Sequence, residues 1–297
     1  MRAFELCRAW RASRGLPQLR ALWSDEGRAR ACTVGRVQGR VIWATDAEYL
    51  NDSQELRYAR DHLAKEFRSA SERLAGRAKE PHTEDPDTSS AAILSAALTA
   101  LEGGDEVAPS SAVHVFVACF CEDGDLLSQW RGYAAGAGYA VGLDTDALET
   151  AVLGPMPHQE LPVRLVGLRR VSYGDDLLRP RVDALVARVI EQPSAHPYVM
   201  GDHLARGEIL PMLAEFKHPA FAEEQEWRLI ATDQYGEPVN FRPGPLGPTP
   251  YVEFDFGSAL VEVKVGPGPH QELRQRAVQR LVPCGVAVTL SDAPFRG

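Results

Sequence analysis

The feature that most restricts the fold is the run SAVHVFVACFC at residues 111–121, which is apolar almost throughout. Valine and phenylalanine favour extended backbone, and a strand with no polar alternation needs cover on both faces. The run therefore predicts a strand at the centre of a sheet. His114 lies within it and is interpreted as a core histidine with a satisfied hydrogen bond rather than as a metal ligand.

Shorter strands and helices are interspersed around this run without an internal repeat. Alternation and apolar runs predict strands at 39–45, 136–144, 163–173, 226–232 and 260–268, short strands within 239–256, and a last strand after residue 285. Apolar periodicity predicts helices from about Ser53 to Leu74 and at 91–102, 125–134, 146–153, 175–192, 201–216 and 270–282, with Asp125 as an N-cap. Residues 1–38 are expected to form a helical extension and 77–90 a mobile polar loop.

This order indicates one α+β domain over residues 1–297, with helical insertions on a mainly antiparallel core. The five cysteines are odd in number and scattered, which indicates reduced thiols and an intracellular protein. The N-terminus lacks the apolar stretch of a signal peptide, and no segment has the ~18 apolar residues that span a membrane. We therefore expect a cytoplasmic protein without a membrane partner. A net charge of -9 argues against obligate nucleic-acid binding, although it leaves a local basic patch open.

In the segment FAEEQEWRLI (221–230), two of the glutamates, Glu224 and Glu226, lie two residues apart at the start of a predicted strand, where neighbouring carboxylates repel each other. Because side chains alternate along a strand, Glu224, Glu226 and Arg228 should share one face. Trp227 and Leu229 should then form a core face on the other side. One interpretation pairs Glu226 with Arg228 and leaves Glu224 in water, as a solvated surface. The other makes the two carboxylates a functional pair that lines a concave surface.

Two further windows contain candidate ligand-binding residues. Asn51 and Asp52 lie at a strand-to-helix junction, where free backbone N–H groups hold a phosphate or where the side chains simply cap the helix. In the run DLLSQWRGYA (125–134), Ser128, Trp130, Arg131 and Tyr133 combine rings with polar groups that could hold a ligand. The alternative is that Trp130 and Tyr133 form an ordinary core stripe. P-loop, G-x-S-x-G and H-E-x-x-H motifs are absent from the sequence.

The blocks WATDAEYLNDSQE, DLLSQWRGYAAGAGYAVGLD, HPAFAEEQEWRLI, VKVGP and SDAPFR, in this order, identify a resemblance to a bacterial domain-of-unknown-function family, number twenty-nine seventy-one. The resemblance runs from about residue 39 to 296. This resemblance does not by itself imply an activity.

A more distant resemblance is to the ADP-ribosyltransferases, which have a split antiparallel β core. It rests on the strand VFVACFC, the helix LLSQWRGYA, a glycine turn, the strand YAVGL and a late strand that starts with Glu224-Gln225-Glu226. The resemblance implies that Ser128 and Tyr133 hold nicotinamide and that Glu226 is the catalytic glutamate. The family's first-strand His has no counterpart before His62. Arg8, Arg11 or Arg36 could replace it, and their spacing does not choose among them; otherwise the chain has lost NAD chemistry or the fold analogy is wrong.

The resemblance implies an NAD-dependent enzyme of a toxin or defence kind that transfers ADP-ribose to a protein, to a nucleic acid or to water. In that chemistry Glu226 would stabilise the ribose cation, and Glu224 would orient or deprotonate the acceptor. One alternative is a non-catalytic ligand-sensing or interaction domain with the same pocket. Another is a metal-dependent nuclease or hydrolase that uses Asp123, Asp125, Glu224 and Glu226, although we expect no bound metal.

Overall fold

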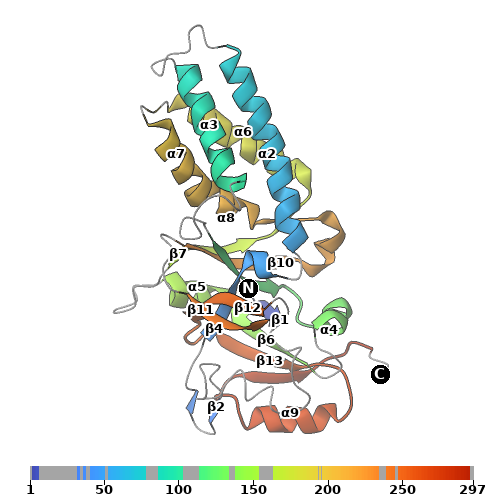
Figure 1. The fold of residues 1–297 in the computed structure, drawn as a ribbon. Coiled ribbons are helices and arrows are strands. Elements are labelled where there is room, and N and C mark those ends of the chain that lie inside the picture. The colour runs from blue at the N-terminus through green and yellow to red at the C-terminus, as the bar shows by residue number, and fades with distance from the viewer. Residues whose placement is uncertain are drawn as a thin grey trace.

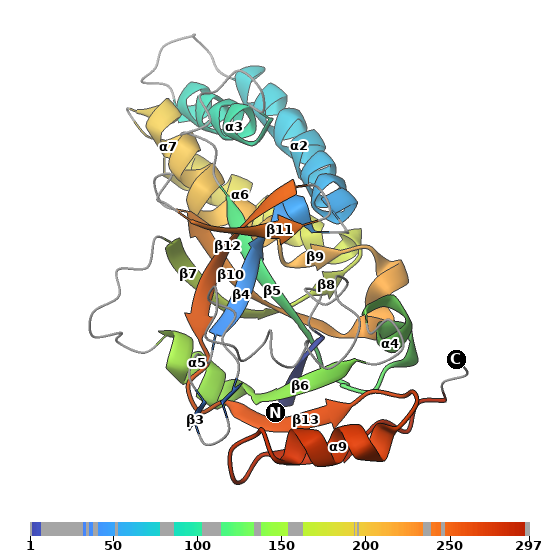
Figure 2. The same cartoon turned by 60° about the horizontal axis from the view of Figure 1, so that its bottom comes forward.

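The chain has a helical half and a sheet half in the computed structural model (Figure 1). The structure describes residues 2–6, 32–33, 36–37, 41–50, 53–77, 86–102, 114–133, 138–153, 163–192, 194, 196–233, 239–244 and 247–294. In both views the long helices lie at one end and the last strands with helix α9 at the other (Figures 1 and 2). The expected mixture of helices with a mainly antiparallel sheet is confirmed.

The main sheet is built around β5 (Val115–Cys121), the strand predicted from the apolar run. The other strands of this sheet are β1 (Arg2–Leu6), β4 (Val41–Asp46), β6 (Tyr139–Asp144), β7 (Val163–Arg170), β10 (Glu226–Asp233), β11 (Asn240–Gly244), β12 (Gly247–Asp255), β13 (Leu260–Val265) and β14 (Ala287–Leu290). All pairs in it are antiparallel except β13 with β14.

The sheet forks at β5. One edge of β5 pairs along its whole length with β10, from Glu226 opposite Cys121 to Thr232 opposite Val115. The other edge is shared, because β4 pairs at Val117 and Phe116 while β1 pairs at Cys121. From there one branch continues through β12 to β11 and the other through β6 to β13 and β14.

Strand β10 is covered on both faces, which explains why a segment that starts with charged residues becomes central. Leu229 and Ala231 belong to the main core of the sheet half, with Trp227 packed against that core. Helix α5 (Thr145–Leu153) closes this face. On the opposite face, Ile230 packs with Val117 and with Ala214 of the helical half.

The helical half contains α2 (Ser53–Ala75), α3 (Pro86–Glu102), α6 (Asp175–Glu191), α7 (Pro197–Leu204) and α8 (Leu210–Leu213). Their apolar faces meet in one core that includes Phe67, Ile93, Leu178 and Ile209. Gly201 allows α7 to cross α3 closely, because a Cβ there would lie 2.6 Å from the Cβ of Ala96. The helices come from two separate parts of the chain, 53–102 and 175–213, so this half is held together by tertiary packing.

A proline inside the predicted helix 201–216 is accommodated by a change of helix type. The π-helical turn η4 (Ala205–Ile209) separates α7 from α8, and Pro211 stands in the first turn of α8. Proline has no N–H to donate there, and an uninterrupted α-helix would place its ring against the preceding turn. The helix therefore widens into a π-helical turn before Pro211 and continues as α8 instead of ending there.

Small elements connect the two halves and end the chain. They are the 3-10 turns η2 (Ala47–Tyr49) and η5 (Pro219–Glu224), the strands β8 (Ser172–Tyr173) and β9 (Phe216–Lys217), and the helices α4 (Leu127–Tyr133) and α9 (Gln271–Gln279). Strands β8 and β9 pair in parallel. The short hairpin β2 (Cys32–Thr33) and β3 (Arg36–Val37) completes the described elements.

Two predictions differ from the structure where their residues are described. Of the helical extension expected over residues 1–38, residues 2–6 form β1, which pairs with both β5 and β6, and residues 32–33 and 36–37 form β2 and β3. Residues 7–31 lie outside the described part, so the helices expected there are not tested. The strand conformation of RAFEL (2–6) comes from its pairing with β5 and β6, which are distant in the sequence. The periodicity of these five residues does not show which distant strands they pair with. The loop expected at 77–90 is helical from Pro86 onward, while residues 78–85 lie outside the described part. Among the described residues, no helix combines the length and hydrophobicity needed to cross a membrane.

Candidate functional site

Two of the three glutamates of the EEQE segment (223–226), Glu224 and Glu226, meet at a buried lysine. Lys217 Nζ lies 2.7 Å from Glu224 Oε2 and 2.9 Å from Glu226 Oε2. Lys217 comes from β9 and its side chain is fully buried. The ammonium lies between the two carboxylates, so the repulsion that the sequence suggested is offset by a cation from another strand.

Arg228 completes a cluster of four charges, which we call the charge quartet: Lys217, Glu224, Glu226 and Arg228. Arg228 Nε lies 2.8 Å from Glu226 Oε1, and its Nη1 donates to the carbonyl oxygen of Ala214 at 2.8 Å. The quartet contains two positive and two negative side chains and is therefore formally neutral. Burial of such a group is tolerated because each charge faces an opposite charge.

Glu226 stays ionised although only 2% of it is exposed. Burial on its own would raise the pKa of this carboxyl. The charges of Arg228 and Lys217, with hydrogen bonds from Arg228 and Cys119, outweigh burial and lower the pKa to about 2. The carboxylate is therefore negative over the whole physiological range of pH.

The expected strand alternation fails at Glu224. Strand β10 begins at Glu226, whereas Glu224 ends the 3-10 turn η5 and Gln225 has φ 43°. A left-handed backbone is uncommon for a residue with a side chain. This conformation turns the chain sharply, so that Glu224 approaches Lys217 from η5 and Glu226 approaches it from the strand. The two glutamates converge on Lys217 because of the left-handed turn at Gln225, which the alternation in the sequence did not predict.

Groups around the quartet are kept in their neutral form. Burial, with Asp123, Glu224 and Glu226 nearby, raises the pKa of the Cys121 thiol to about 12. Burial also raises the pKa of Tyr173 to about 12, and its hydroxyl oxygen accepts a 2.8 Å hydrogen bond from the Glu226 backbone N–H. A thiol with such a pKa is a poor nucleophile at neutral pH, so Cys121 has a packing role.

Trp130 is a core residue in this structure. It is 1% exposed and packs with Cys121 and Ala140, and its Nε1 donates to Asp125 Oδ1 at 2.8 Å. A Cβ at position 266 would lie 2.7 Å from the indole ring, so Gly266 leaves the space that the ring fills. The ring is thus surrounded by protein rather than presented to a ligand.

The helix α4 nevertheless lies beside the quartet. Trp130 contacts Cys121, and Cys121 is the strand partner of Glu226. Ser128 and Arg131 are exposed on the same helix, and the side chain of Tyr133 lies outside the described part. The structure therefore brings the two sequence windows together through Cys121, with the polar members of α4 at the surface.

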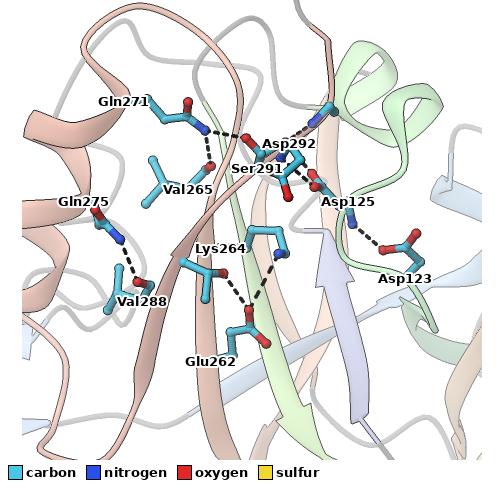
Figure 3. Close-up of polar contacts among 12 residues, drawn as sticks. Asp123, Asp125, Glu262, Lys264, Val265, Gln271, Gln275, Val288, Ser291 and Asp292 are labelled. Carbon is cyan, nitrogen blue, oxygen red and sulfur yellow. Dashed lines mark hydrogen bonds and ion pairs between the residues drawn. The ribbon is translucent and has the colours of Figure 1, made fainter.

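Asp125 was expected to be an N-cap, but its carboxylate accepts hydrogen bonds from Trp130 and from the segment after β14. Its Oδ1 accepts hydrogen bonds from Trp130 Nε1 and from the Ser291 hydroxyl. Its Oδ2 accepts from the Asp292 backbone N–H at 2.8 Å, and Figure 3 shows Asp125 with Ser291 and Asp292. One carboxylate thus ties α4 to the segment that follows β14. The C-terminal end and α4 lie on the same side of the molecule in both ribbon views (Figures 1 and 2).

Amide side chains of α9 hold the same C-terminal segment from the other side. Gln271 Nε2 donates to the carbonyl oxygens of Val265 and Ser291, and Gln275 Nε2 donates to that of Val288 (Figure 3). These bonds join β13, β14 and α9. The last described residues are therefore an ordered part of the fold next to Trp130.

The phosphate site proposed at residues 51–52 is not tested, because Asn51 and Asp52 lie outside the described residues. The neighbouring Asp46 caps η2 by accepting from Glu48 N at 3.0 Å, and its other oxygen lies 2.8 Å from His114 Nδ1. His114 thus has the satisfied contact that we expected. Arg8 and Arg11 also lie outside the described part, and only the backbone of Arg36 is described.

The carboxylates proposed as metal ligands have other contacts. Asp125 binds the C-terminal segment, and Glu224 and Glu226 bind Lys217. Across the described ranges, no three His, Cys, Asp or Glu side chains are grouped as metal ligands would be. The geometry gives the nuclease interpretation no support.

Lys217 and Tyr173 are the residues of this region that sequence reasoning missed. Lys217 directly follows the predicted helix 201–216, and nothing in the sequence EFKHP (215–219) indicates that its side chain is buried. Its role depends on the pairing of β8 with β9 beside the start of β10. The one available signal was the EEQE repulsion itself, which required a cation from elsewhere in the chain.

A family model described as "Protein of unknown function (DUF2971)" matches residues 129–229. This match supports the family that the sequence blocks indicated, over a shorter range than the expected 39–296. It includes Gln129–Arg131 and the whole of Glu224–Arg228, and hence the charge quartet. No curated protein and no solved structure matches the chain.

Proposed function

We propose that the chain is an ADP-ribosyltransferase-like enzyme that uses NAD as substrate and Glu226 as its catalytic carboxylate. One observation carries the proposal: Glu226 is a buried carboxylate that remains ionised, at the start of β10 and opposite Cys121, the last residue of β5. A negative charge held in a site from which water is excluded stabilises a developing cation far better than one in bulk water.

The reaction gives Glu226 and Glu224 separate tasks. The bond between ribose and nicotinamide breaks, and its electron pair leaves with the nicotinamide nitrogen. Positive charge then develops on the ribose, and Glu226 stabilises that charge through a ribose hydroxyl. An acceptor's lone pair forms the new bond to the ribose carbon while its proton passes to Glu224 or to water.

The quartet must rearrange for this chemistry. Both oxygens of Glu226 are engaged by Arg228 and Lys217 in the described state. Two cations beside one carboxylate reduce its effect on a ribose cation, since they offset its charge. A productive complex therefore needs Lys217 to take another anionic partner while Glu226 turns toward the ribose.

The same contacts favour a second function, a non-catalytic interaction domain. A buried, fully hydrogen-bonded ion cluster is a structural connection wherever no ligand displaces it. In this function the quartet only fixes η5 and β9 onto the sheet. Binding and turnover of NAD separate the two functions.

The experiment measures nicotinamide release from NAD by the purified chain, with candidate protein and nucleic-acid acceptors present and absent. Wild type is compared with Glu226→Gln and with Glu223→Gln, which removes an exposed charge of the same turn. We expect turnover for wild type and Glu223→Gln and at least a hundredfold loss for Glu226→Gln, the size found when a central electrostatic group is removed.

Glu224→Gln should reduce transfer to an acceptor more than it reduces NAD cleavage, because its task concerns the acceptor's proton. Circular dichroism of each variant separates loss of chemistry from loss of fold. If wild type neither binds nor consumes NAD with any acceptor, the enzyme proposal fails and the interaction domain remains.

A further inference from the structure

Trp43 differs from the other tryptophans of the described residues in how its ring nitrogen is used. The indole N–H groups of Trp130 and Trp227 each donate to a carboxylate, at 2.8 Å to Asp125 and at 2.9 Å to Glu122. Trp43 Nε1 is buried and has no hydrogen-bond partner within the described part of the chain, although the residue itself is partly exposed. A buried donor without an acceptor is rare in a folded protein, so packing alone does not explain an indole at position 43.

A carboxylate faces Trp43 across two paired strands. Glu253 of β12 is the direct partner of Trp43 on β4, so the two side chains leave the sheet on the same face. Glu253 is partly exposed, and among the described residues its carboxylate accepts one hydrogen bond, over a long 3.4 Å from the Tyr251 hydroxyl. An indole N–H and a carboxylate thus face each other without a bond between them.

The Trp43 ring is held in place by its other neighbours. Its centroid lies 4.9 Å from that of Tyr251, and the Arg242 guanidinium lies over it at 5.3 Å. Arg242 Nη2 also donates to the Thr45 hydroxyl at 2.6 Å. Arg242 and Tyr251 have further interactions in the structure. They therefore position the ring, and contact with a ligand falls to Trp43 and Glu253.

This pair lies on the same face of the sheet as Glu226. Strands β12, β4 and β5 are neighbours in the sheet (Figure 2), and β10 follows β5. Thr45 of β4 pairs with Val117 of β5, and Val117 pairs with Ile230 of β10. Directly paired residues share a face, and side chains alternate along each strand. Trp43 and Glu226 therefore project from that one face, and the main core of the sheet half lies on the other.

We propose that Trp43 and Glu253 bind a nucleoside, with its base stacked on the indole ring and a ribose hydroxyl bonded to the carboxylate. Every base has a flat π face that stacks on an aromatic side chain. A hydroxyl suits the two protein groups because it donates one hydrogen bond and accepts another. It donates to Glu253, and it accepts from the indole N–H when the ring turns toward it. An acidic group does not fit here, since Glu253 would repel it.

In the proposed enzyme this nucleoside is the adenosine end of NAD. The nicotinamide riboside would lie at Glu226, two strands away from Trp43, and neighbouring strands are about 4.8 Å apart. The two ends of an extended dinucleotide need such a separation. Cys119, the one partly exposed residue of β5, lies on the strand between them. The assignment to NAD rests on the proposed function, whereas the nucleoside site itself does not.

The test is a calorimetric titration of the purified chain with adenosine and, separately, with dideoxyadenosine, which keeps the base and lacks both ribose hydroxyls. Wild type should bind adenosine at least about tenfold more tightly, because the dideoxy compound loses a hydrogen bond to a carboxylate. Glu253→Gln should reduce that preference at least about threefold, since a neutral acceptor forms a weaker bond. Glu48→Gln, which removes an exposed carboxylate just after β4, should keep the wild-type preference.

A second set of variants tests the stacking ring. Trp43→Ala should weaken adenosine binding by roughly fivefold to 150-fold, the range for loss of one stacked aromatic side chain. Trp43→Phe should lose less, because it keeps a ring against Tyr251. Phe241→Ala removes an exposed ring from the neighbouring strand β11 and should leave adenosine binding unchanged. The proposal is overturned if wild type does not bind adenosine, if it binds both compounds equally, or if Phe241→Ala loses as much as Trp43→Ala.

The same variants separate this site from the proposed reaction. Adenosine binding that depends on Trp43, without NAD turnover, would keep the nucleoside site and reject the enzyme proposal. If wild type consumes NAD, Trp43→Ala should raise the KM for NAD, because it removes a binding contact. NAD turnover by a chain that binds no adenosine, with a KM that Trp43→Ala leaves unchanged, would do the reverse.

Discussion

Glu226 neutralises two buried cations, so its substitution affects stability as well as chemistry. In Glu226→Gln, Arg228 and Lys217 would share Glu224 as the one remaining carboxylate of the quartet. Removal of one partner from a buried ion pair costs about 3–5 kcal/mol. We expect a loss of this size in the free energy of urea unfolding, compared with a change below about 0.5 kcal/mol for the exposed Glu223→Gln. Equal stability of both variants would mean that the quartet is solvated.

The lowered pKa of Glu226 predicts an acid-sensitive contribution to stability. The pKa is about 2 in the folded chain and 4.5 for the unperturbed group. The folded state therefore binds the proton less readily, and the contribution is full above pH 4.5 and is lost as pH falls toward 2. The difference between wild type and Glu226→Gln in unfolding free energy should shrink by on the order of 3 kcal/mol over this window. A difference that does not change with pH would contradict the ionised assignment.

At the scale of elements, Asp125 joins α4 to the end of the chain. Asp125→Asn places an NH2 group against one of the N–H or O–H donors that the carboxylate now accepts. We expect a loss of about 1–3 kcal/mol, faster hydrogen exchange at residues 291–294 and a changed Trp130 fluorescence. Asp292→Asn is the matched control, because Asp292 contributes its backbone N–H to this contact. Slow exchange in Asp125→Asn would show that α9 alone holds the segment.

Helices α3 and α7 approach each other too closely for a side chain at position 201. Gly201→Ala would place its Cβ 2.6–2.8 Å from atoms of Ala96, Ile93 and Ala97. Overpacking of this kind costs about 1–3 kcal/mol. Gly132→Ala in α4, where no atom lies within 4 Å of the new Cβ, should instead stabilise the chain by about 0.5–1 kcal/mol. Thermal unfolding of both variants measures the contrast, which would be absent if the helices separate freely.

The sequence predicted elements well where the pattern was local. The apolar run identified β5, and the spacing of Leu56, Leu63 and Phe67 identified α2, because periodicity reflects burial directly. It failed for β1, whose conformation comes from its pairing with β5 and β6. It also placed Glu224 on the strand, since the left-handed Gln225 leaves no mark in an alternating pattern.

For the molecule as a whole, the order of the elements predicted the α+β class and the antiparallel core. Only part of the candidate site could be predicted in this way. Glu224 and Glu226 were recognised as an unusual pair from their repulsion. The cation that resolves it, Lys217, comes from a strand that forms only through tertiary pairing. The sequence left Trp130 as either a ligand-binding residue or a core residue, and its contacts with Cys121 and Asp125 favour the core.

The most direct test of this account is a crystal structure of the chain with NAD. We predict that the nicotinamide riboside lies against Glu226 and that the Glu226 side chain has turned from Lys217 toward the ribose. A structure obtained at saturating NAD in which Lys217 still binds both glutamates, with NAD absent or bound elsewhere, would contradict the account.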